Sequence, residues 1–88
     1  MSCIKGLWKN QFGDIIQFSD MYKGEIYHLD YNYDSEKKEF KNQEKIVLRK
    51  TNETHFYISQ SEILNGNYII VENNSLIINN VRYFKHDS

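Results

Sequence analysis

Apolar and polar side chains alternate without a break in Tyr27-His28-Leu29-Asp30-Tyr31-Asn32-Tyr33. The odd positions carry aromatic or aliphatic side chains, and the even positions carry polar ones. Successive side chains of a strand point to opposite faces of the sheet, so a period of two is typical of a strand with one buried face. We therefore expect a half-buried β-strand over residues 27–33.

The same spacing occurs in shorter form on both sides of this stretch. Apolar residues two positions apart indicate strands whose apolar side chains lie on one face, with intervening residues such as Tyr57 facing away. These pairs are Ile16 with Phe18, Ile46 with Leu48, and Phe56 with Ile58.

The last third of the chain contains three turn candidates, Asn65-Gly66, Asn73-Asn74 and Asn79-Asn80. Asparagine tolerates positive φ better than other non-glycine residues, and a type I′ hairpin turn requires positive φ twice in succession. We therefore expect a β-meander of short strands over residues 67–72, 75–79 and 81–85. The strand around Tyr68–Val71 is apolar on both faces, so we expect it to be central and covered on both sides.

Two stretches lack this periodicity. Residues 34–44 carry many charges with Phe40 as the only large apolar side chain, which predicts a solvated loop continuing into strand ends. Residues 59–62 have the Ser-x-x-Glu spacing of a capping box. The sequence leaves open whether residues 59–65 form one helical turn or a strand.

These elements predict an all-β fold for residues 1–88 as a single small domain. Roughly seven to eight short strands, with at most one helical turn, are too many to lie flat and still bury a core. We expect a small antiparallel barrel or a rolled meander, because rolling also limits exposed sheet edges.

The residues Gly6-Leu7-Trp8 resemble the G-x-W signature in the first strand of lipocalin-like (calycin) barrels. In that family an arginine from the last strand packs across the tryptophan ring, which implies structural roles for Trp8 and for Arg82 in the last expected strand. The chain is shorter than typical family members, and the family's Thr-Asp-Tyr segment has no counterpart here. The resemblance implies a small-molecule carrier, with an interior that 88 residues would leave narrow.

Composition limits the classes of partner and the compartment. Eleven basic and twelve acidic residues give a net charge of −1, which argues against nucleic acid, because phosphate binding needs clustered Lys and Arg. No apolar run approaches the roughly 20 residues of a membrane-spanning helix. One cysteine and no apolar leader predict a reducing, cytoplasmic location.

We find no motif for catalysis, metal binding or a cofactor. The spacing Asp30-x-Asn32-x-Asp34 resembles the start of a calcium-binding loop, but Ser35 replaces the required glycine and Lys41 replaces the closing glutamate. No nucleophile elbow or phosphate-binding glycine loop is present. The sequence therefore predicts a protein that is not an enzyme.

Aromatic residues make up 15% of the chain. They either form the core, with tyrosine hydroxyls reaching the barrel rim, or exceed what the core requires and suggest two functions. The first is an interaction protein, for example an inhibitor or modulator, that binds a protein through a tyrosine-rich sheet face or loops. Its candidate surface residues are Tyr22, Tyr27, Tyr57 and Phe40. The alternative is a carrier of an apolar or aromatic ligand, with cavity candidates Tyr31, Tyr33, Phe56, Tyr68 and Ile70. A homodimer is compatible with either function.

Overall fold

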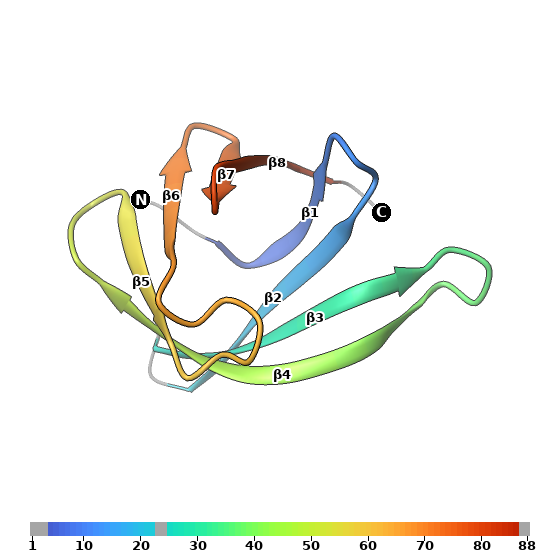
Figure 1. The fold of residues 1–88 in the computed structure, drawn as a ribbon, viewed down its shortest axis with the longest axis horizontal. Coiled ribbons are helices and arrows are strands. Elements are labelled where there is room, and N and C mark those ends of the chain that lie inside the picture. The colour runs from blue at the N-terminus through green and yellow to red at the C-terminus, as the bar shows by residue number, and fades with distance from the viewer. Residues whose placement is uncertain (1–3, 23–24, 87–88) are drawn as a thin grey trace.

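The structure, a computed structural model, describes residues 4–22 and 25–86, and for residues 20–22 it describes the backbone alone. Eight antiparallel strands form a closed barrel in which each strand pairs with its neighbours in the chain and β8 pairs with β1 (Figure 1). This confirms the prediction of a small all-β antiparallel barrel. Within the described ranges no helix is long and apolar enough to cross a membrane. The strands are β1 (Gly6–Asn10), β2 (Ile15–Tyr22), β3 (Ile26–Asp34), β4 (Glu39–Lys50), β5 (His55–Ser59), β6 (Tyr68–Glu72), β7 (Ser75–Ile78) and β8 (Val81–Lys85).

Asparagine-based turns connect the last three strands, as expected. Asn79 and Asn80 have φ of 51° and 64°, and they join β7 to β8 in a two-residue hairpin. In the hairpin between β6 and β7 Asn73 has φ of 50° but Asn74 has no positive φ, so the two successive positive values of a type I′ turn occur at 79–80 and not at 73–74. Positive φ at these positions is the conformation that asparagine tolerates and that tight hairpins require.

The third turn candidate is wrong as a hairpin. Asn65-Gly66 lies inside a longer connection, residues 60–67, that joins β5 to β6. This connection is neither the helical turn nor the strand that the sequence left open. It is a non-helical turn in which the Ser61 hydroxyl accepts a hydrogen bond from the Leu64 backbone N–H at 3.0 Å. A serine thus bonds to the N–H three residues on, as a cap would, although no helix follows.

Side chains fill the barrel interior. The predicted pairs Ile16 with Phe18, Ile46 with Leu48 and Phe56 with Ile58 all point inward, which confirms the faces assigned from the alternation. Several aliphatic side chains are completely buried, so the interior around them is solid. The buried core consists of Ile4, Trp8, Ile16, Phe18, Tyr27, Leu29, Ile46, Leu48, Phe56, Ile58, Ile69, Val71, Leu76 and Ile78.

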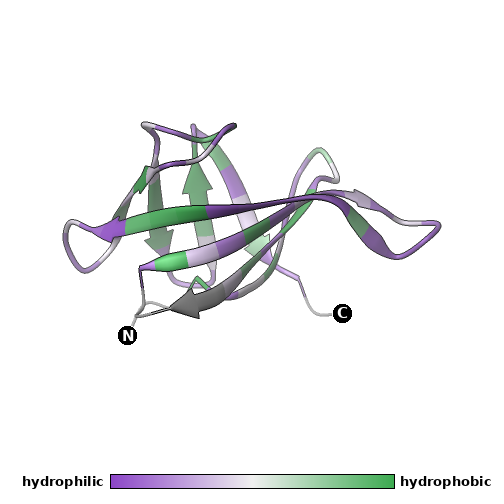
Figure 2. Ribbon diagram, turned by 90° about the horizontal axis from the view of Figure 1, so that it is seen from below, coloured by the Kyte–Doolittle hydropathy of each residue, from purple (hydrophilic) through white to green (hydrophobic). Residues whose placement is uncertain are grey.

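The strands β3 and β4 extend beyond the barrel as a two-stranded arm (Figures 1 and 2). β4 has 12 residues and pairs with β3 from Glu39 to Val47, but it pairs with β5 only from Val47 to Lys50. The expected solvated loop over residues 34–44 is therefore only the short turn at residues 35–38. Figure 2 shows that the arm is largely hydrophilic and that hydrophobic residues concentrate around the barrel. Both faces of the arm reach solvent, which explains why residues 34–44 show no alternation.

Two further expectations about faces are wrong. β6 is not covered on both sides, because Tyr68 is 46% exposed and Ile70 is half-buried on the outer face. A closed barrel has a single inner face, so no strand can be buried twice. Asp30, expected to be solvated, is buried; it lies between Gln17 and Gln43 on neighbouring strands and accepts a hydrogen bond from the Gln43 side chain at 2.7 Å.

The barrel closes where β1 meets β8, around the buried Trp8. The indole N–H donates to the Ile4 carbonyl at 2.9 Å, and the Lys85 ammonium lies 4.7 Å from the ring centroid. The prediction that Arg82 covers this ring is wrong. Arg82 points outward and bonds to the Ser75 hydroxyl at 2.7 Å and to Glu72 at 3.3 Å. Register explains the difference, because Trp8 stands opposite Lys85.

Candidate functional site

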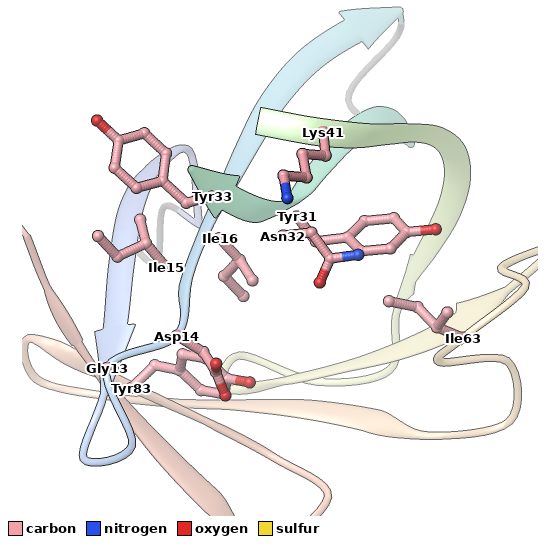
Figure 3. A pocket seen from close by; sticks show the side chains of 10 residues that line it. All are labelled: Gly13, Asp14, Ile15, Ile16, Tyr31, Asn32, Tyr33, Lys41, Ile63 and Tyr83. Carbon is pink, nitrogen blue, oxygen red and sulfur yellow. The ribbon is translucent and has the colours of Figure 1, made fainter. Parts of the chain in front are cut away.

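A groove of about 550 Å³ opens at the base of the arm, at one end of the barrel (Figure 3). It forms where β2 and β3 separate, because their pairing begins only at Gln17 with Asp30 and leaves Ile15 and Ile16 beside the opening. Asn32, with φ of 58°, lies within β3 at the same level. The groove is lined by Gly13, Asp14, Ile15, Ile16, Tyr31, Asn32, Tyr33, Lys41, Ile63 and Tyr83.

Aromatic and aliphatic side chains form part of the groove walls, beside the polar side chains of Asp14, Asn32 and Lys41. Figure 3 shows Tyr31 and Tyr33 on opposite sides, with Tyr31 directed toward Ile63 and Tyr33 lying near Ile15. Tyr31 also packs against the core. Tyr33 meets Phe40 edge to face, with ring centroids 5.0 Å apart and planes at 60°. This geometry is the one that aromatic pairs prefer, so it holds the Tyr33 ring in place on the arm.

The β1–β2 turn supplies the polar side of the groove. The Asn10 side-chain oxygen accepts hydrogen bonds from the backbone N–H groups of Phe12 and Asp14, at 2.9 and 3.0 Å. The Asn10 amide also donates to the Asp14 carboxylate at 3.2 Å, so the turn and its carboxylate are held together. Burial raises the pKa of Tyr83, the negative charge of Asp14 raises it further, and a hydrogen bond with Asn10 lowers it. The Tyr83 hydroxyl is therefore a neutral donor at physiological pH.

Glu44 attaches the 60–67 connection to the barrel mouth. Its Oε1 accepts hydrogen bonds from the Ser61 hydroxyl and from the Glu62 backbone N–H, the latter at 3.0 Å. This clamp positions Ile63, the next residue, which is 50% exposed and lines the groove. Burial raises the pKa of Tyr31, and the negative charges of Glu44 and Glu62 raise it further.

Sequence reasoning did not single out Glu44. A signal was present, because Glu44 has the same parity along β4 as the core residues Ile46 and Leu48. A carboxylate on the apolar face of a strand needs hydrogen-bond donors, and here the following connection supplies them.

The structure brings three of the candidate residues together and separates the others. Tyr31, Tyr33 and Phe40 lie on the arm, and the first two line the groove. Tyr27 is buried in the core, so its assignment to a binding surface is wrong. Phe56 is a core residue and is not among the residues that line the groove. Tyr22 ends β2, and its side chain lies outside the described residues.

Tyr57 and Tyr68 form an aromatic pair on the outer face of β5 and β6. Their ring centroids lie 5.1 Å apart with planes at 63°. Tyr57 thus faces away from the core, as the alternation predicts. The assignment of Tyr68 and Ile70 to a cavity is wrong, because both lie on the outside of the barrel.

The groove offers binding groups rather than a reaction centre. Its charged side chains are Asp14 and Lys41, on different walls. Among the residues that the structure describes, no three His, Cys, Asp or Glu side chains are grouped to hold a metal ion. The arrangement can accommodate an aromatic group against its tyrosines and isoleucines and offer hydrogen bonds to its edges from the polar side chains.

Comparison with known proteins adds no relative, since no family model, no curated protein and no solved structure matches this chain.

Proposed function

We propose that this chain is a non-enzymatic binding protein that holds an apolar or aromatic side chain of a protein partner in the groove at the base of the arm. One observation carries the proposal: the groove combines three tyrosines with three isoleucines at an open end of an otherwise filled barrel. Tyrosine provides a large rigid surface with a polar tip and is enriched at the energetic centres of protein interfaces.

The openness of the groove supports a protein partner. Its walls come from four separate parts of the fold: the β1–β2 region, β3 and β4 of the arm, the 60–67 connection, and β8. The arm stands clear of the barrel on one side, so a macromolecule can approach the groove (Figure 2). Lys41 and Asp14 provide one cation and one anion to orient a polar partner segment around an inserted side chain.

Affinity capture with groove variants tests the proposal. Tyr33→Ser and Ile63→Ser remove groove walls that are partly exposed, so the fold should remain intact. Tyr68→Ser is the matched control, since it removes an exposed aromatic residue from the outer face. We expect the unchanged chain and the Tyr68 variant to retain a stoichiometric protein that both groove variants lose. Loss with the Tyr68 variant alone would place binding on the outer face and reject the groove.

A second candidate function is carriage of a small ligand in the same groove. The volume of about 550 Å³ favours it, because small-molecule sites commonly range from about 300 to 1,000 Å³. Native mass spectrometry of the purified chain separates the two functions. A bound mass that disappears in the Tyr33 and Ile63 variants supports a carrier, whereas a mass-free chain that captures a protein supports the interaction function.

A further inference from the structure

The arm leaves strand edges unpaired although the barrel is closed, and the longer of the two among the described residues belongs to β4. β4 pairs with β5 only over Val47–Lys50, so residues 39–46 have β3 on one side and no strand on the other. In Figure 1 this part of β4 forms the outer border of the arm. An unpaired edge of this kind is a template for another strand.

The backbone direction along this edge follows from hydrogen bonds at its end. The Leu48 N–H points toward β3, where it bonds to the Glu25 carbonyl at 2.8 Å, and the Thr51 N–H points toward β5, where it bonds to the His55 carbonyl at 2.9 Å. Backbone groups alternate sides along a strand. The N–H and C=O groups of the odd residues 39, 41, 43 and 45 therefore point to the free edge, and no described residue bonds to them there.

We propose that β4 pairs with β4 of a second copy of this chain, antiparallel, over residues 39–45. A two-fold axis at Asn42 places Glu39 opposite Lys45 of the second copy and Lys41 opposite its Gln43. All four odd residues of each copy then exchange backbone hydrogen bonds with the other copy. The two arms become one continuous four-stranded sheet.

Charge selects this register over its neighbours. The ladder requires odd residues to face odd residues, so one strand can shift relative to the other only by two residues at a time. Each such shift moves the two-fold axis by one residue. An axis at Lys41 places Lys41 of one copy opposite Lys41 of the other, and an axis at Gln43 places Lys41 opposite Lys45 of the other copy. Like charges directly opposite are destabilising, whereas the Asn42 register makes two Glu39–Lys45 pairs.

The 60–67 connection leaves room for the second copy. Ser61 and Glu62 bond to the carboxylate of Glu44, an inward-facing side chain, so after Gln60, where φ is 56°, the connection turns toward the inner face of the sheet. The contact is small, and edge lysines generally weaken strand pairing, so we expect a dissociation constant on the order of 100 µM.

A charge-exchange experiment with the full chain tests both the pairing and its register. Sedimentation velocity from about 10 µM to about 1 mM should show the unchanged chain passing from monomer to dimer. Glu39→Lys and Lys45→Glu should each weaken self-association about tenfold. In either variant, residues 39 and 45 that face each other across the dimer carry the same charge in both pairs. Mixing these two variants should restore the dimer, because both pairs are then opposite in charge.

A proline substitution tests the backbone ladder independently. Gln43→Pro removes an N–H that points to the free edge and leaves the β3 pairing intact, so it should abolish dimerisation. Gln43→Ala is its control, since it loses the same side-chain bond to Asp30 but keeps the N–H. Amide exchange should slow with concentration at residues 41 and 43 but not at Asn42. A chain that is monomeric at about 1 mM, or a dimer that the proline leaves unchanged, would overturn the proposal.

Discussion

Replacing Glu44 by alanine should loosen the 60–67 connection and destabilise the barrel measurably. Glu44 accepts two hydrogen bonds, from the Ser61 hydroxyl and the Glu62 N–H, and Ser61 is itself buried. Hydrogen bonds to a charged group contribute about 1.5–3 kcal/mol each, and partial solvent access places these at the lower end. The described residues provide no hydrogen bond for the buried Oε2 of Glu44. Removing this oxygen is therefore favourable and offsets part of the decrease in stability. We expect a net decrease of about 2 kcal/mol in the free energy of unfolding.

Two matched variants make this estimate specific to the clamp. Glu44→Gln keeps an acceptor oxygen but loses the charge, so it should lose about 1 kcal/mol. Glu39→Ala removes an exposed glutamate from the same strand and should change stability by less than about 0.5 kcal/mol. Two kcal/mol corresponds to a decrease in Tm of roughly 8–16 °C for a domain of this size.

Urea unfolding gives the free energies, and amide exchange of Glu62 and Leu64 reports the connection itself. Both amides bond within the clamp, so they should exchange faster in Glu44→Ala while the core strands stay protected. A Glu44→Ala protein that matches Glu39→Ala in stability, with unchanged exchange at Glu62, would refute the clamp.

Three further predictions follow from the turns, the barrel closure and the partly buried tyrosines Tyr31 and Tyr83. Asn79→Ala should destabilise the β7–β8 hairpin by about 1 kcal/mol in urea unfolding, because alanine is strained at φ of 51°, whereas Asn79→Gly should be nearly neutral. Gly6→Ala should lower the free energy of unfolding by about 2 kcal/mol, because φ at this position is 125° and a Cβ would meet the Lys85 ammonium at 2.5 Å. Displacing Lys85 should also shift Trp8 fluorescence. If thermal melts match those of the unchanged chain, this packing is wrong. The pKa values of Tyr31 and Tyr83 are higher in the folded chain than the value of 10 that tyrosine has in the unfolded chain. The stability linked to these groups is therefore fully present below pH 10 and is lost as pH rises through their folded-state pKa values. Unfolding monitored against pH should therefore show a loss above pH 10 that Tyr83→Phe reduces, and an unchanged profile in that variant would contradict the assignment.

The barrel could be predicted because its sequence signals are local. Alternation identifies the inward side chains of β2, β3, β4 and β5, and each of these strands has one buried face. The turns at residues 73–74 and 79–80 were also predictable, because positive φ restricts the residue type strongly. Asn65-Gly66 carries the same signal, yet it occupies a longer connection, since a dipeptide does not determine where the flanking strands begin.

Residues that meet through register could not be predicted from the chain. Arg82 and Lys85 are both cations near the end of β8, and only the β1–β8 pairing shows that Lys85 stands opposite Trp8. The groove has the same origin, because it depends on where β2 separates from β3 and on how Glu44 holds Ile63. These contacts join residues distant in sequence, and periodicity contains no information about them.

Unequal strand lengths connect the two proposals. β3 and β4 have 9 and 12 residues, whereas β1, β5, β6, β7 and β8 have 4 or 5. A barrel can pair only the length that neighbouring strands share, so the excess of β3 and β4 must leave it as an arm. One consequence is the groove beside Tyr31 and Tyr33, and the other is the free edge over residues 39–46. The groove and the free edge thus belong to one element and meet at Lys41, which lines the groove and whose backbone faces the edge, so Gln43→Pro should abolish dimerisation while every groove residue stays in place.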